Sequence, residues 1–97
     1  MAKGYWIVHM TVLEQDAYRS YVKAARPFLA DRGARFLVVG GQYEAVEGAA
    51  QPRHIVIEFD SYDAARDAYH SPEYAEIRKL REGACDADIL IVEGLSA

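Results

Sequence analysis

The sequence has little cysteine and no long apolar run. Its 97 residues contain a single cysteine, Cys85, which excludes an internal disulfide and any metal site built from several cysteines. No apolar stretch approaches the ~20 residues that cross a membrane, and the first residues lack the apolar segment of a signal peptide. We therefore expect a cytoplasmic protein that does not have a membrane as a partner.

Positive charge is also in short supply. Eleven Lys and Arg residues stand against fifteen Asp and Glu residues, which gives a net charge of -4, and the basic residues are scattered along the chain. Proteins that bind a phosphate backbone carry clusters of Lys and Arg, so we expect no nucleic-acid partner. A chain of 97 residues with 52% hydrophobic side chains predicts a single domain over residues 1–97, since an average domain has ~150 residues.

Apolar periodicity predicts the element order βαββαβ. Stretches rich in β-branched and aromatic residues indicate strands at residues 4–12, 34–39, 53–59 and 88–93. Helical spacing indicates one helix over residues 15–31 and a second from Ser61 to Gly83 that restarts at Ser71-Pro72, with Arg78 and Arg81 facing outward. The simplest fold is α+β and ferredoxin-like, a four-stranded antiparallel sheet with two helices on one face.

The Gly40-Gly41 pair leaves two alternatives. It could form a two-residue hairpin turn between residues 34–39 and 42–47, or a bulge at which one long strand bends. We favour the bend, because residues 48–53 make a better loop into the next strand. The pair is not predicted to be a phosphate-binding loop, since no helix start or Lys-Ser/Thr follows it.

Alternation within the strands separates the two faces of the predicted sheet. One face of the first and third strands is consistently apolar and should meet the helices, namely Trp6, Val8, Met10, Val12, Ile55, Ile57 and Phe59. Residues 36–39 and 89–92 of the outer strands are apolar on both faces, which is typical of strands covered on both sides. Two helices cover one face, so the other would expose a large apolar patch. This predicts a homodimer paired sheet to sheet.

Three polar residues fall on the face away from the helices, namely His9, His54 and Glu58. The first and third strands are antiparallel neighbours in this topology, and two registers are open, with His9 opposite either His54 or Val56. Both registers bring the two imidazoles within side-chain reach. A His–carboxylate group of this kind could act as a general base or bind a ligand, or it could be a structural hydrogen-bond network at the dimer interface.

Other candidate roles follow from the same positions. Tyr5 and Tyr43 join His9, His54 and Glu58 as candidate ligand-binding residues, whereas the tyrosines at helical spacing are expected to pack in the core. Two histidines and a carboxylate can bind a metal, but no further ligand stands in a suitable place. We therefore expect neither a metal nor a cofactor.

The chain resembles a known bacterial family. The resemblance is carried by Gly4-Tyr5-Trp6, Tyr18, Tyr21, Gly40-Gly41, Tyr43-Glu44, Glu47-Gly48, Ile57-Glu58-Phe59, residues 69–74, Arg78 and Val92-Glu93-Gly94. Together these residues are similar to the family known as domain of unknown function 1330, in the dimeric α/β-barrel superfamily. The resemblance implies two ferredoxin-like protomers packed sheet to sheet and implies no activity. Many members have a basic residue where this chain has Val39, so an anion-binding role does not carry over to that position.

Two functions are compatible with these observations. The first is a small homodimeric protein that binds a small organic molecule in the barrel without chemistry of its own. The second is a cofactor-independent enzyme, isomerase-like or monooxygenase-like, in which His9 or His54 transfers a proton and Glu58 orients the imidazole. Fold alone does not decide between them.

Overall fold

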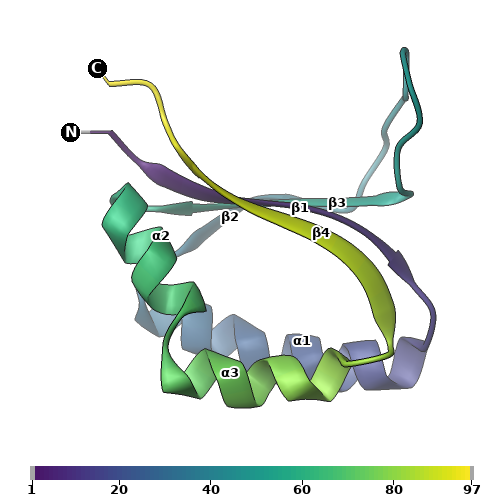
Figure 1. Cartoon of the computed structure of the whole chain (residues 1–97), viewed down its shortest axis with the longest axis horizontal. Coiled ribbons are helices and arrows are strands. Elements are labelled where there is room, and N and C mark those ends of the chain that lie inside the picture. Colours follow the sequence, from purple (N-terminus) through teal and green to yellow (C-terminus); the bar gives the residue numbers. More distant parts are fainter. Residues whose placement is uncertain (1, 97) are drawn as a thin grey trace.

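The computed structural model describes residues 2–96 and confirms the predicted order of elements. Its helices and strands are β1 (Gly4–Val12), α1 (Gln15–Asp31), β2 (Arg35–Val39), β3 (Arg53–Phe59), α2 (Tyr62–Tyr69), α3 (Pro72–Arg78), the 3-10 turn η1 (Lys79–Arg81) and β4 (Cys85–Glu93). The strands form one antiparallel sheet in the order β2-β3-β1-β4. The helices lie together beneath one face of this sheet (Figure 1), so the ferredoxin-like α+β prediction is confirmed.

Local signals in the sequence explain where the helices begin and end. The Ser61 hydroxyl accepts a hydrogen bond from the backbone N–H of Ala64 at 3.0 Å and so caps α2. Ser71 does the same for α3, whose first residue is Pro72, a position where a proline loses no helical hydrogen bond. After α1, Gly33 has a φ of 76°, the left-handed conformation that commonly follows a helix.

The core lies between the helices and the sheet, with Trp6 at its centre. Its indole Nε1 donates to the carbonyl oxygen of Ala65 in α2 at 2.8 Å. Its ring packs against Phe59 and Tyr74, at centroid distances of 5.2 and 5.1 Å. The predicted helix-facing residues Val8, Met10, Ile55 and Ile57 are buried in the same cluster, which confirms the prediction from strand alternation.

The structure rejects both predicted roles of Gly40-Gly41. The two glycines have φ values of 66° and 85°, and two successive residues in the left-handed region turn the chain out of the sheet. Residues 42–47 therefore form no strand and belong to a loop over residues 40–52. The last hydrogen bond before this loop runs from the Gly40 N–H to the His54 carbonyl oxygen at 2.9 Å.

The other face of the sheet, here called the open face, is not covered by any helix within residues 2–96 (Figure 1). Its apolar residues include Leu90, 53% exposed, with Val38 and Val92 at 40% and 38%. Loop 40–52 and residues 94–96 extend to this side from opposite ends of the sheet. The open face therefore carries exposed apolar residues and lies between two projecting segments.

The last strand is longer than predicted. β4 begins at Cys85, three residues before the predicted start at Asp88, because Cys85, Asp86 and Ala87 continue the ladder opposite the end of β1. Small and acidic residues carry little strand signal, so this pairing becomes visible only when β1 lies alongside.

Candidate functional site

The open face brings His9 and His54 together. The two residues are direct partners in the β1–β3 ladder, and their Nδ1 atoms are 2.8 Å apart. One Nδ1 carries the hydrogen and donates it, and the other accepts. Of the two registers open to the sequence, the structure has the one with His9 opposite His54.

Loop 40–52 and β4 complete the surroundings of this pair. The Tyr43 ring lies edge-on to His54 at a centroid distance of 4.8 Å. Gln51 Nε2 donates to the His9 carbonyl oxygen at 3.1 Å and to Asp88 Oδ2 at 3.0 Å. A hollow of about 210 Å³ beside the pair is lined by His9, Ala49, Ala50, Gln51 and Asp88. Gln51 and Asp88 were not predicted, because only the folded loop and the β1–β4 register bring them to His9.

Glu58 does not belong to the histidine pair. Its carboxylate accepts hydrogen bonds from the Tyr5 hydroxyl at 3.1 Å and from Arg35 Nε at 2.8 Å. The register places Glu58 opposite Tyr5, four residues and about 13 Å along β3 from His54. The prediction that Glu58 orients an imidazole is therefore wrong.

Within the Tyr5–Glu58–Arg35 group, the negative charge of the Glu58 carboxylate lies between two donors, the Arg35 guanidinium and the Tyr5 hydroxyl. The hydrogen bond from Arg35 is the main cause of a lowered pKa at the Glu58 carboxyl. The hydrogen bond to Glu58 in turn raises the pKa of the Tyr5 hydroxyl. At neutral pH Glu58 is therefore ionised and Tyr5 is protonated, an arrangement that fixes both side chains on the open face.

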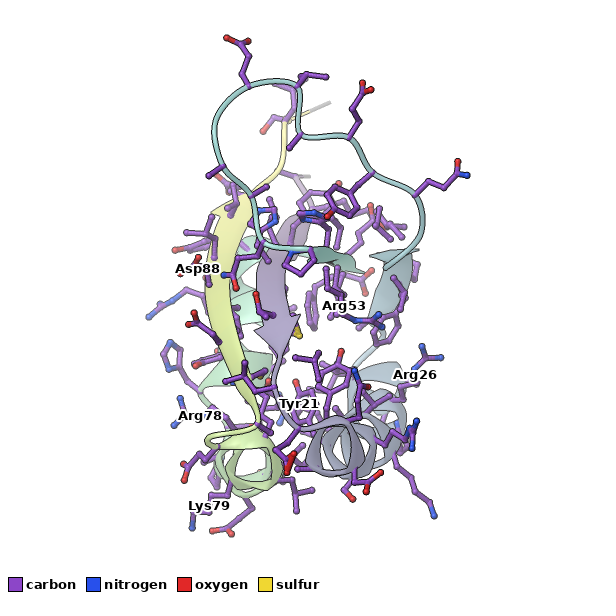
Figure 2. The ribbon with its side chains drawn as sticks, turned by 90° about the vertical axis from the view of Figure 1, so that its right-hand side faces the viewer. Tyr21, Arg26, Arg53, Arg78, Lys79 and Asp88 are labelled. Atoms are coloured by element: carbon purple, nitrogen blue, oxygen red, sulfur yellow. The ribbon has the colours of Figure 1, made fainter. Side chains whose placement is uncertain are left out.

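A second site lies on the opposite side of the sheet. A cavity of about 50 Å³ between α1 and the sheet has mostly apolar walls, including Trp6, Val8, Val22, Ala25, Phe36, Ile55 and Ile89. Figure 2 shows Tyr21 and Arg26 on α1 and Arg53 on β3 at this end of the molecule, on either side of the space between helix and sheet. We call this space the α1 cavity.

The α1 cavity has one polar end. The Tyr21 and Tyr74 hydroxyl oxygens are 2.5 Å apart, and the Arg81 guanidinium carbon lies 5.3 Å from the centroid of the Tyr21 ring. Burial raises the pKa of Tyr21 well above its ordinary value, so this hydroxyl keeps its proton. Arg81 Nε is buried and has no hydrogen-bond partner within residues 2–96.

Sequence reasoning missed this polar end. Tyr21 and Tyr74 were expected to pack in the core, which they do, and Arg81 was expected to face outward, which is wrong. The 3-10 turn after α3 rotates Arg81 away from the helical pattern and places it on the cavity wall. A tighter turn of this kind has no clear periodic signal over three residues.

A groove adjoins the α1 cavity. It has a volume of about 560 Å³ and shares Tyr18, Val22 and Arg53 with the cavity wall. Its other lining residues are Thr11, Val12, Gln15, Arg19, Lys23 and Pro52. The small cavity therefore continues into a wider and more polar space at the surface.

Membrane-spanning helices and metal-binding clusters are both absent from the described residues. Between residues 2 and 96, no helix is long and apolar enough to span a membrane. The same part of the chain contains no group of three or more His, Cys, Asp or Glu side chains placed to hold a metal ion.

The sheet order and the one-sided helices define a ferredoxin-like α+β protein. Within this class, the chain belongs to the family described as Domain of unknown function (DUF1330), whose family model matches residues 3–95. The family resemblance seen in the sequence is thereby confirmed. None of the curated proteins matches the chain at a significant level.

Solved structures share this fold at low sequence identity. A protein of unknown function from Rhodopseudomonas palustris has a TM-score of 0.78 and 16% identity, covering 99% of this chain and 85% of that chain. SnoaB, a cofactor-independent oxygenase from Streptomyces nogalater, has a TM-score of 0.67 and 13% identity, covering 100% and 97%. A dimeric ferredoxin-like protein of unknown function from Bacteroides fragilis has a TM-score of 0.62 and 14% identity, covering 94% and 95%. Identities this low show the fold alone.

The pKa of Glu58 predicts how acid affects stability. A lowered pKa in the folded state contributes stability that is present above the ordinary value of 4.5 and is lost as the pH falls through the folded-state pKa. Glu58→Gln should therefore lose less stability than the wild type between pH 7 and pH 3. Urea unfolding at both pH values measures this, with Glu47→Gln in loop 40–52 as the control. An equal loss in wild type and Glu58→Gln would contradict the assignment.

Proposed function

We propose that the protein is a homodimer that binds a small organic molecule in the α1 cavity of each protomer. The observation that carries this proposal is the cavity itself, which has apolar walls and one polar end formed by Tyr21, Tyr74 and Arg81. Ligand sites in proteins are typically apolar hollows with a few placed polar groups. The adjoining groove supplies a route from solvent and room for the rest of a molecule.

The proposed binding site is not the one expected from the sequence, which was the surroundings of His9 and His54. The hollow beside His9 has walls of two alanines and three polar residues and offers less apolar surface to an organic molecule than the α1 cavity does. The α1 cavity offers both apolar walls and a buried donor without a partner in the described residues, Arg81 Nε. The open face then has a different proposed role, which is assembly.

The open face supports a dimer with a second copy of the chain. β1 and β4, with nine residues each, span about 30 Å, and four strands span about 15 Å. The sheet alone therefore covers at most about 450 Å², and the two projecting segments would supply the rest of the ~800 Å² that each partner contributes to a stable interface. Leu95 and Val46 on those segments are 97% and 76% exposed, so they would gain cover from a copy seated between them.

Pairing through the open face predicts the mass of a dimer, and it predicts that a charge placed in this face disrupts the dimer. Light scattering after size exclusion should give about 22 kDa for the wild type, twice the 10.9 kDa of one chain. Leu90→Asp should give a monomer, because it places a charge in the apolar face. Leu13→Asp is the control, since Leu13 is at least as exposed as Leu90 but lies outside the strands. A monomeric wild type, or a dimeric Leu90→Asp variant, would contradict this interface.

Filling the α1 cavity should abolish ligand binding. Ala25 lies on its wall and is 4% exposed, so Ala25→Leu places three more carbons in the space. In a thermal-shift screen of small organic molecules, compounds that stabilise the wild type should not stabilise this variant. At a hundred times Kd the stabilisation amounts to about 2.7 kcal/mol, which such a screen detects.

Ala30→Leu is the matched control for this screen. Ala30 is on the same helix but is exposed and does not line the cavity. It should respond to every compound as the wild type does. Compounds that stabilise Ala25→Leu as much as the wild type would place the binding site elsewhere and defeat the proposal.

A second candidate function is cofactor-independent catalysis at the histidine pair. The 2.8 Å contact between His9 and His54 favours it, because an imidazole that shares its proton with a neighbour is suited to proton transfer. The fold of SnoaB, a cofactor-independent oxygenase, shows that such chemistry occurs on this architecture. If this function holds, the wild type should consume a compound found in the screen and His54→Ala should not. Equal consumption by both proteins would exclude the pair from the chemistry.

A further inference from the structure

We propose that the molecule bound in the α1 cavity is a small organic acid, whose carboxylate is held by Arg81 and the Tyr21–Tyr74 hydroxyl pair. This inference rests on the proposed binding function and names the chemical class of the ligand. It is carried by the charge of the cavity walls, by donors that lack acceptors and by the shape of the space.

The walls of the cavity and groove are basic, although the whole chain is acidic. The cavity wall contains Arg26, Arg53 and Arg81. The groove adds Lys23 and Arg19, of which Arg19 forms an ion pair with Asp16 at 3.2 Å. Neither lining contains an Asp or Glu residue, although the chain has fifteen of them and a net charge of -4. A hollow lined by charge of one sign raises the local concentration of the opposite ion, so this one attracts anions.

The three arginines of the cavity wall are held by aromatic rings and not by carboxylates. None of the ion pairs found between residues 2 and 96 involves these arginines. Each guanidinium instead lies over a ring 5.3 to 5.5 Å away, in the pairs Arg26–Phe36, Arg53–Tyr18 and Arg81–Tyr21. Arg53 Nε also donates to the Tyr18 hydroxyl at 3.3 Å. The remaining N–H groups of a stacked guanidinium stay available for a carboxylate.

The polar end of the cavity includes donors that have no acceptor in the described part of the chain. Arg81 Nε is buried without a partner in the described part of the chain, and a buried donor left unpaired costs stability. The Tyr21–Tyr74 hydrogen bond uses one of the two hydroxyl protons, so the other can be donated elsewhere. An ionised carboxylate only accepts hydrogen bonds and so satisfies both donors, whereas an amine adds a donor and an alcohol carries no charge.

The size of the space limits the acid. One water needs about 10–15 Å³ of such volume, so the enclosed 50 Å³ accommodates a carboxylate and a few carbons. The carbons would contact Val22, Ala25 and Ile55 on the cavity wall. A longer acid would extend past Tyr18 into the groove.

Two probes of nearly equal shape, one charged and one neutral, test whether charge or shape determines binding to the α1 cavity. Calorimetric titration of the wild type should show that 3-methylbutanoate binds at least tenfold more tightly than 3-methylbutanamide. Arg81→Met, which keeps the length and apolar stem of the side chain, should abolish this preference. Arg78→Met is the matched control, because Arg78 contacts the Tyr69 hydroxyl outside the cavity, and it should keep the full preference.

A second measurement needs no variant at all. In the wild type, the side-chain Nε–Hε resonance of Arg81 should shift on adding 3-methylbutanoate and stay in place on adding the amide. This readout keeps the test valid if Arg81→Met does not fold.

The possible results separate this inference from the proposed function. Equal affinity for acid and amide, with both lost in Ala25→Leu, would overturn the organic acid and leave the cavity as a binding site. An acid preference that Arg81→Met retains would overturn the assignment to Arg81. Failure of both probes to bind would also overturn the acid, and the Ala25→Leu screen would then decide on the cavity separately.

Discussion

The sheet has two faces, and helices cover one of them. This constraint determines most of what the molecule can do. Alternate residues of the central strands, such as Trp6 and Phe59, are buried beneath the helices. The residues between them in the alternation, such as His9 and Val56, lie on the open face. In the proposed arrangement, a second copy contacts the open face and a small molecule binds on the helix side. The two candidate sites share no residue, so assembly and binding can be altered separately.

The α1 cavity lies beside a core that is filled by aromatic rings on the side of α2 and α3. There Trp6, Tyr69 and Tyr74 contact one another. On the side of α1, the cavity wall combines the Tyr18 ring with the much smaller Ala25. Protein interiors seldom keep voids, and a void that holds an unpaired cationic donor lowers stability further. A molecule that fills the space and accepts from that donor removes both costs.

Much of the fold was predictable from sequence because strand alternation and helical spacing are local signals. β1 and α1 have the predicted bounds, and alternation placed His9 and His54 on the same face. Alternation does not determine the register between β1 and β3, because that register depends on pairing between residues 45 positions apart. In that register Glu58 lies opposite Tyr5 and not near the histidines. The two glycines with left-handed backbone turn the chain away, so that residues 42–47 are not part of the sheet. The α1 cavity was not predictable, since a void reflects side-chain volumes from several elements, and the rotation of Arg81 depends on a single short turn.

The pairing of β1 with β4 has a consequence for folding. The two strands run together from Gly4 and Glu93 to Val12 and Cys85, and the Gly94 N–H donates to the Lys3 carbonyl oxygen at 2.7 Å. Most of the domain therefore separates β1 in the sequence from its longest partner, β4. Contacts between such distant residues slow folding, because the whole intervening chain must be closed into a loop first. One edge of β1 therefore stays without its ladder until almost all of the domain has been made, and a chain cut short before residue 85 keeps that edge free to pair with other strands.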